Sequence, residues 1–245
     1  MKNQTTLIIG ANSGIARALA IQIATQEKNT QLIVISRNSD FYQQKIFNDS
    51  AVFTVADYQE ETIKKVIQQV WEVSRTHIAQ VFICHGVLHT DRIKPEKKLQ
   101  DFSAENLSEL MLSNAITPLL WLKRLTPMLS GNNPCKVVFF SARVGSISDN
   151  RLGGWYSYRA SKAALNMLIK STSIELARSA KNIKLISFHP GTTDTPLSKP
   201  FQKNVPEDKL FSSDFVATQL QKIVINSDID GQASFIDWQG EAIPW

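Results

Sequence analysis

Short apolar runs rich in β-branched residues alternate along this chain with longer amphipathic stretches, and this alternation restricts the fold more than any other feature. The short runs are largely continuous in apolar character, which is typical of strands buried on both faces. The longer stretches repeat their apolar residues with the period of a helix. A strand–helix alternation of this kind predicts an α/β fold, in which a parallel sheet is covered by helices on both faces. The predicted strands are residues 6–9, 32–35, 51–55, 80–84, 136–140, 183–188 and 234–236, and the predicted helices are residues 15–26, 61–73, 104–129, 158–178 and 215–225.

Composition is typical of a soluble globular protein, with 245 residues of which 43% are hydrophobic and 20% charged. No repeat or linker divides the chain, so we expect one domain over residues 1–245. The net charge of +5 is scattered, which argues against a nucleic-acid partner. Cys84 and Cys135 lie in apolar runs, where a free thiol is typical and a reducing compartment is favoured. No segment has the length of a signal peptide or a membrane span, so we expect a cytoplasmic protein without a membrane partner.

A glycine-containing turn follows the first predicted strand and leads directly into the first predicted helix. Glycines permit a tight turn, and the free N–H groups at the start of a helix favour a pyrophosphate. An ordinary strand-to-helix turn with a serine or asparagine cap is the alternative interpretation. The pattern predicts a phosphate-binding turn formed by Gly10, Asn12, Ser13, Gly14 and Ile15.

Two tyrosines, Tyr156 and Tyr158, precede a single lysine, Lys162. In a helix, Tyr158 and Lys162 stand at positions i and i+4 and share one face, whereas Tyr156 lies elsewhere. A phenol has an ordinary pKa of about 10, and a neighbouring ammonium stabilises its ionised form. The spacing therefore indicates Tyr158 as an acid/base group with Lys162 beside it. The alternative is two helix neighbours without a chemical role.

Asn114 lies inside an otherwise apolar predicted helix, four residues before Pro118. Proline has no N–H to donate to the carbonyl four residues back, so the main-chain oxygen of Asn114 loses its helical partner. We therefore expect a kink at this point and an oxygen that is free to bind water. A capping or surface asparagine in a kinked helix is the alternative.

In this order and spacing, these motifs resemble the short-chain dehydrogenase/reductase family over nearly the whole chain. Gly10 and Gly14 match its T-G-x-x-x-G-x-G turn, with Ala16 in place of the third glycine, and residues 158–162 match its Y-x-x-x-K motif. Residues 189–195 match its P-G-x-x-x-T stretch, and residues 141–165 with the end of the chain are more narrowly similar to the C-factor group and the sniffer-type carbonyl reductases. The resemblance implies a Rossmann fold with a doubly wound parallel sheet of about seven strands.

The resemblance also implies the roles of further residues. Tyr158 and Lys162 would be catalytic, Lys162 would hold the nicotinamide ribose, and Asn114 would hold a water that relays protons. The family's usual serine falls on Ala142, so Ser141 is the candidate for its role and Ser146 the reserve. Residues 191–213 would form the substrate loop. Beyond the phosphate turn, the implied cofactor-binding residues are Ser36, Arg37, Asp57, Cys84, His85, Gly86, Tyr158, Lys162, Pro190, Gly191, Thr193 and Thr195.

Ser36 and Arg37 at the end of the second predicted strand bear on the choice of cofactor. Family members that prefer NAD usually have an aspartate in the place of Ser36, and a guanidinium suits a phosphate. We therefore expect NADP(H) in preference to NAD(H). The alternative is that Arg37 points into solvent, as many loop arginines do.

The function predicted from these features is hydride transfer between the nicotinamide and a small carbonyl or alcohol substrate. The alternative is a dinucleotide-binding signalling or regulatory protein with little turnover. No residues have the spacing of metal ligands, so no metal site is expected. Oligomeric state stays open, because family members often pair through the helices near Asn114 and Lys162 whereas related carbonyl reductases can be monomers.

Overall fold

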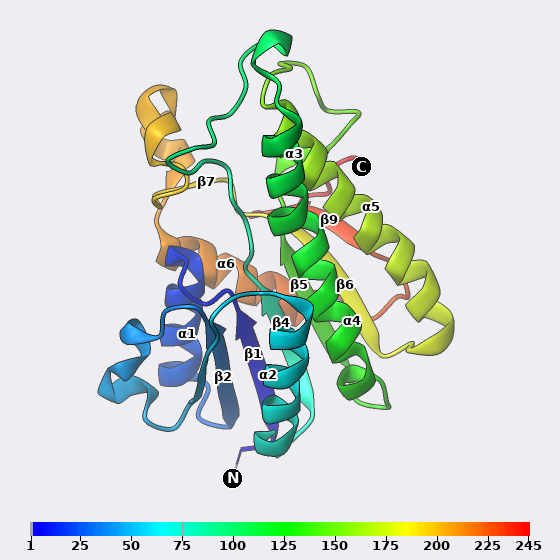
Figure 1. The fold of residues 1–245 in the computed structure, drawn as a ribbon. Helices are drawn as coiled ribbons and strands as arrows, with labels where there is room; N and C mark the ends of the chain where they lie inside the picture. The colour runs from blue at the N-terminus through cyan, green and yellow to red at the C-terminus, as the bar shows by residue number, and fades with distance from the viewer. Residues whose placement is uncertain (1, 75) are drawn as a thin grey trace.

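The centre of the molecule is a parallel sheet, seen in a computed structural model that describes residues 2–74 and 76–245 (Figure 1). Within these residues the sheet has seven strands in the order β3-β2-β1-β4-β5-β6-β9, and each neighbouring pair is parallel. The seven predicted strands are therefore confirmed, with ends that differ by at most two residues. The strands are β1 Gln4–Ile9, β2 Thr30–Ser36, β3 Ala51–Thr54, β4 Ile78–Ile83, β5 Cys135–Phe140, β6 Ile183–His189 and β9 Ser234–Asp237.

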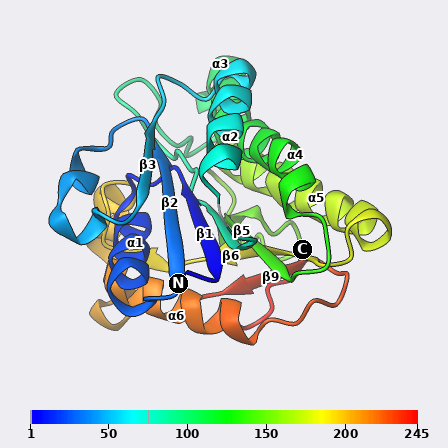
Figure 2. The ribbon, with the colours of Figure 1, turned by 90° about the horizontal axis from the view of Figure 1, so that it is seen from below.

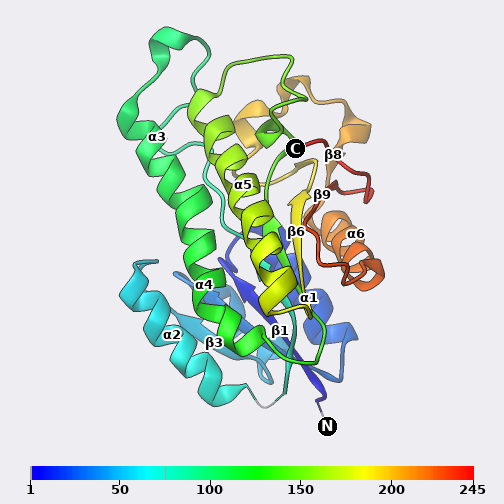
Figure 3. The ribbon, with the colours of Figure 1, turned by 90° about the vertical axis from the view of Figure 1, so that its right-hand side faces the viewer.

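Helices cover both faces of this sheet. Successive residues of a strand point to opposite faces, so a strand that is apolar throughout needs a helical layer on each side to bury it. Leu7 and Ile9 belong to the core beneath one helical layer, whereas Ile8 between them belongs to the core on the other side. Continuously apolar strands thus supply two cores, as the sequence predicts. Figures 2 and 3 show the layers: α1 Gly14–Gln26 and α6 Ser213–Asn226 lie on one face, and α2 Glu60–Val73, α4 Thr117–Leu129 and α5 Tyr156–Ser179 lie on the other.

The two edge strands differ from the inner ones. In β3 the residues alternate between partly buried and exposed, and in β9 they alternate between partly buried and buried. The prediction that every run is buried on both faces is therefore wrong at the edges of the sheet. An edge strand has a neighbour on one side only, and the helical layers cover it less completely.

The long helix predicted over residues 104–129 is interrupted near its middle. The structure has α3 Ala104–Met111, then a π-helical segment Leu112–Ile116, and then α4. In that segment the Thr117 N–H donates to the carbonyl of Leu112, five residues back. The irregularity expected ahead of Pro118 thus takes the form of a π-helical turn, a feature often found at functional sites.

The region predicted as a long loop, residues 191–213, contains more regular structure than expected. Two short strands, β7 Thr192–Thr193 and β8 Leu210–Phe211, pair in parallel, and two 3₁₀ helices, Lys199–Asn204 and Glu207–Lys209, lie between them. Strands of two residues carry no periodic signal, so the sequence could not indicate them. Among the described residues, no helix is long and apolar enough to cross a membrane.

Candidate active site

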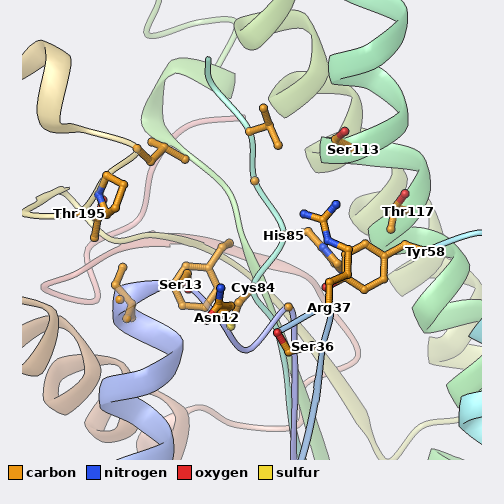
Figure 4. A pocket seen from close by; sticks show the side chains of 18 of the residues that line it. Asn12, Ser13, Ser36, Arg37, Tyr58, Cys84, His85, Ser113, Thr117 and Thr195 are labelled. Carbon is orange, nitrogen blue, oxygen red and sulfur yellow. The ribbon is translucent and has the colours of Figure 1, made fainter. Parts of the chain in front are cut away.

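A cavity of about 1290 Å³ lies where the strands end, between the turn before α1 and the first turns of α5 (Figure 4). This volume exceeds that of most sites for drug-sized ligands. The predicted site residues line the cavity, except Asn114 and the reserve serine Ser146. The lining includes the phosphate turn, the Ser36–Arg37 pair, the Cys84–Gly86 segment and the predicted residues Pro190, Gly191, Thr193 and Thr195. The structure thus gathers residues from distant parts of the chain around one space that is large enough for a dinucleotide and a small substrate.

The phosphate turn is held by its own side chains. The Ser13 hydroxyl caps α1 by accepting the N–H of Ala16 at 3.3 Å. A Cβ added to Gly14 would lie 2.8 Å from the Ser213 hydroxyl and 3.3 Å from the Thr195 methyl group, so the turn packs closely against residues 191–213 and α6, and a larger residue would require the Ser213 side chain to move. The first N–H groups of α1 have no partner within the helix, which makes this turn fit a pyrophosphate.

At the other side of the cavity lie Ser36, Arg37 and Asp57. The buried Ser36 hydroxyl accepts the Asn38 N–H at 3.3 Å. The Arg37 guanidinium carbon lies 5.1 Å from the ring centroid of Tyr58, and in the described part of the chain Arg37 makes no ion pair with a carboxylate. Hydrogen bonds near the start of α2 hold the pKa of Asp57 below its ordinary value. The guanidinium is therefore available to an anionic group in the cavity.

Cys84 and His85 line the cavity between the phosphate turn and the side that contains Ser36, Arg37 and Asp57. Burial raises the pKa of the Cys84 thiol, which stays protonated. Burial, with the charges of Arg37 and Lys162, lowers the pKa of His85 to about 3, so its ring is neutral. The two side chains thus present no charge to the cavity.

Tyr158 and Tyr156 lie in different surroundings, although two positions separate them. Tyr158 is 6% exposed and lines the cavity, whereas Tyr156, the first residue of α5, is 38% exposed and does not. The ammonium nitrogen of Lys162 lies 5.8 Å from the Tyr158 ring centroid and donates to the carbonyl of Phe140 at 2.7 Å. Of the two tyrosines, only Tyr158 shares the cavity with Lys162.

Burial affects the two groups in opposite directions. It raises the pKa of the Tyr158 phenol above its ordinary value, because a phenolate would be poorly solvated there. It lowers the pKa of Lys162 to about 7 for the same reason. Without another charge in the cavity, the phenol keeps its proton and the amine readily gives up its own.

Contacts at several points fix α5 and with it these two side chains. A Cβ on Gly145 would lie 2.8 Å from backbone and side-chain carbons of Lys162, so the loop after β5 packs directly on the helix. At the start of the helix, the buried carboxylate of Glu96 accepts both the N–H and the hydroxyl of Ser157. One turn after Lys162, the side-chain oxygen of Asn166 accepts the hydroxyls of Ser141, directly after β5, and of Ser187 in β6. The positions of Tyr158 and Lys162 therefore depend on packing across three segments.

The structure shows the surroundings of Ser141, the candidate for the role of the family's usual serine, and of Ala142, which stands in the place of that serine. The Ser141 hydroxyl lies at the cavity wall but donates to the Asn166 side-chain oxygen at 2.8 Å, which also accepts the Ser187 hydroxyl at 2.6 Å. Ala142 packs against the apolar cluster that contains Tyr158. The reserve candidate Ser146 is buried and accepts the Asp149 N–H at 3.2 Å. The residue at the wall of the Tyr158 cluster is thus an alanine, and the hydroxyl of Ser141 is engaged with α5.

Asn114 lies behind the cavity wall, fully buried in the π-helical segment. Its side-chain oxygen accepts the Val87 N–H at 2.7 Å, and its amide donates to the Val87 carbonyl at 2.8 Å and to the Ser161 hydroxyl at 3.0 Å. The asparagine therefore ties the loop after β4 to α5.

The surroundings of Tyr158 include a group of residues that the sequence did not indicate. Leu88, Ile93 and Leu110 are buried with it, and Trp155 and Phe201 are among the side chains packed against this cluster. They come from loops and from separate helices, so no local pattern connects them. The sequence did not indicate Tyr58 as a residue of the cavity either, although it directly follows Asp57, an expected cofactor-binding residue.

Comparison with known proteins agrees with this arrangement. A family model described as short chain dehydrogenase matches residues 4–206. The chain is 25% identical over 241 residues to 1-hydroxy-2-glutathionyl-2-methyl-3-butene dehydrogenase of Rhodococcus sp. (strain AD45), with 98% of this chain and 99% of that protein covered. It is 31% identical over 148 residues to C-signal of Myxococcus xanthus, with 60% of this chain and 83% of that protein covered.

Solved structures share the fold over the full chain. Carbonyl reductase Sniffer of D. melanogaster superposes with a TM-score of 0.84 at 20% identity, with 100% of both chains covered. NADPH-bound carbonyl reductase from chicken fatty liver gives a TM-score of 0.80 at 19% identity, again with 100% of both chains covered. These identities show the fold alone, whereas the family model spans most of the chain. The resemblance predicted from the motifs is confirmed, and the chain belongs to the short-chain dehydrogenase/reductase family.

Proposed function

We propose that this protein is an NADP(H)-dependent oxidoreductase that interconverts a small carbonyl compound and its alcohol, with Tyr158 as the general acid and base. The observation that carries the proposal is a single cavity that joins a phosphate-binding turn to a buried tyrosine beside a buried lysine. We also propose that residues 1–245 act as one domain, with the substrate bound next to residues 191–213.

The side chains of the cavity divide the chemistry between them. Because burial raises the pKa of Tyr158, its phenol is protonated and suited to donate to a carbonyl oxygen. The bound nicotinamide would supply the hydride to the carbonyl carbon, or accept it from the alcohol. Lys162, when charged, favours the phenolate left after proton transfer, and Asn114 holds the loop and the helix on either side of it in place. A buried phenol beside an amine can thus pass a proton in either direction.

The preference for NADP(H) is supported by the end of β2. Ser36 brings no negative charge to the ribose, and Arg37 lines the cavity without a carboxylate partner among the described residues. A charge-assisted hydrogen bond contributes about 1.5–3 kcal/mol, which corresponds to roughly ten- to a hundredfold in affinity. The NADPH bound to the chicken carbonyl reductase is consistent with this preference.

The substrate side of the cavity supports an uncharged, largely apolar carbonyl compound. Of the cluster around Tyr158, the apolar side chains of Val87 and Leu197 line the cavity with it, whereas Leu88, Ile93, Leu110 and the rings of Trp155 and Phe201 are not part of that lining. An anionic group placed there would lose its hydration without gaining a partner in that cluster.

A second function, dinucleotide binding with little turnover, is favoured by one specific observation. Ala142 stands at the wall of the Tyr158 cluster, so no hydroxyl from that position can bind the substrate carbonyl, and C-signal is among the relatives. The oxidation of NADPH, followed at its absorbance band with a panel of uncharged aldehydes, ketones and diketones, separates the two functions. Turnover of at least one carbonyl compound is expected. Cofactor binding without turnover across the panel would favour the second function.

A further inference from the structure

Three aromatic side chains, Trp121, His85 and Tyr58, all contact one another between the core and Arg37, and this cluster is called the aromatic column. Trp121 of α4 is fully buried, and the ring of His85 stacks on it with 6.4 Å between centroids and 17° between planes. The ring of Tyr58 meets His85 edge-on at 4.5 Å and Trp121 at 6.1 Å. Arg37 lies over Tyr58, at the cavity end of this column (Figure 4).

The column joins elements that are far apart in the sequence. Trp121 belongs to the helical layer, His85 follows β4, and Tyr58 follows β3 at the edge of the sheet. Since β3 is an edge strand that is only partly buried, the residues beyond it need other support. The edge-on contacts with His85 and Trp121 give Tyr58 that support, and offset or edge-to-face geometry is the favourable one for aromatic rings.

His85 suits this place because its ring carries no charge. Burial and the nearby cations of Arg37 and Lys162 keep the imidazole neutral. A charged imidazole would repel the guanidinium that the column supports. The face of Tyr58 is thus free to attract Arg37 by a cation–π contact.

A long arginine side chain that is held in place before a ligand arrives loses less conformational entropy on binding. We propose that Tyr58 is a positioning residue for cofactor selection, and that its ring holds the Arg37 guanidinium in the cavity for the 2′-phosphate of NADP(H). This inference rests on the cofactor preference argued under the proposed function. Tyr58 also lines the cavity, but what it does through Arg37 falls on the phosphorylated cofactor.

The experiment is a double-mutant cycle on cofactor affinity. Dissociation constants for NADPH and NADH are measured by fluorescence for the unaltered protein, Tyr58→Leu, Arg37→Ala and the double variant. Tyr58→Leu is expected to lower the preference for NADPH by about fivefold, and to leave the preference unchanged when Arg37 is already alanine. Equal weakening of both cofactors by Tyr58→Leu would show a structural role only and would overturn the proposal.

Two further variants sharpen the cycle. Tyr58→Phe keeps the ring but removes the hydroxyl, which also interacts with Arg37, so it should retain more of the preference than Tyr58→Leu does; a loss as large as that of Tyr58→Leu would contradict the role of the ring. Phe41→Leu is the matched control, because Phe41 lies 4.7 Å beneath another arginine, Arg17, outside the cavity lining. It should leave the preference unchanged. If Arg37→Ala has no effect on the preference, the assignment of the phosphate contact itself fails, and the role of Tyr58 fails with it.

Discussion

The two ends of the cavity are built in different ways. At the phosphate end, the strand, the turn and the helix follow one another within β1 and α1, and Ser13 caps a helix that begins at the next residue. At the Tyr158 end, the important contacts join residues far apart in the chain, as when Asn166 accepts the hydroxyls of Ser141 and Ser187. The first end depends on local sequence, and the second depends on tertiary packing.

This difference predicts how the two ends respond to substitution. Changes at the phosphate end should alter cofactor affinity with little effect on the proton transfer. Changes at the Tyr158 end should alter turnover or stability and leave cofactor affinity largely intact, except at Lys162, which is also expected to hold the nicotinamide ribose. A variant that crosses this division would contradict the separation of roles.

The largest effect is expected for Tyr158→Phe. Loss of a general acid lowers turnover by about 10²–10⁴-fold, and NADPH affinity should stay within a few-fold of the unaltered protein. Tyr156→Phe is the matched control, because Tyr156 lies outside the cavity and should leave most of the activity. Steady-state kinetics with a carbonyl substrate and fluorescence titration with NADPH measure both quantities. Normal turnover by Tyr158→Phe, or damage by the change at 156 alone, would contradict the assignment.

Lys162→Met should separate function from stability. Burial lowers the pKa of Lys162 from 10.5 to about 7, so between these values the unfolded chain binds more protons than the folded one, and stability rises with pH. Below about pH 7 the buried ammonium is charged and its cost is complete. Methionine has no such cost, so the variant should be inactive but more stable at pH 6 by roughly 2–4 kcal/mol, with the difference shrinking toward pH 10.

Urea unfolding of both proteins at pH 6, 8 and 9.5 measures this effect. If the variant is less stable than the unaltered protein at pH 6, or if the difference in stability does not depend on pH, then burial of the charged Lys162 does not lower the stability of the folded protein. Lys170→Met, about two turns after Lys162 in the same helix, partly exposed and outside the cavity lining, is the control and should show no such trend.

A smaller effect is expected at residues 141 and 142. Ala142→Ser places a hydroxyl against the Tyr158 cluster and should raise turnover by about tenfold, less than the effect of a complete oxyanion-hole donor. Ser141→Ala removes the bond to Asn166 and should lower the free energy of unfolding by about 1 kcal/mol. No gain from Ala142→Ser, together with severe loss of turnover in Ser141→Ala, would assign the carbonyl contact to Ser141 instead.

The sequence predicted most of the fold because its signals are local. The seven strands and the turn before α1 follow from runs of apolar residues and from glycine spacing, and Pro118 indicated the irregular turn that contains Asn114. The surroundings of Ser141 could not be predicted, because the direction of its hydroxyl depends on Asn166, which is 25 residues away. Likewise, Tyr58 gains its meaning only when β3, β4 and α4 bring it together with His85 and Trp121.

The proposed cofactor preference is tested by the affinities of the unaltered protein and of Ser36→Asp for NADPH and NADH. The arrangement of Ser36 and Arg37 at the cavity predicts that the unaltered protein binds NADPH more tightly by roughly ten- to a hundredfold. A carboxylate at position 36 would repel the 2′-phosphate and accept the ribose hydroxyls, so Ser36→Asp should reverse the preference. Equal affinities in the unaltered protein, or a preference for NADPH that survives in Ser36→Asp, would contradict the proposed cofactor and the site built around it.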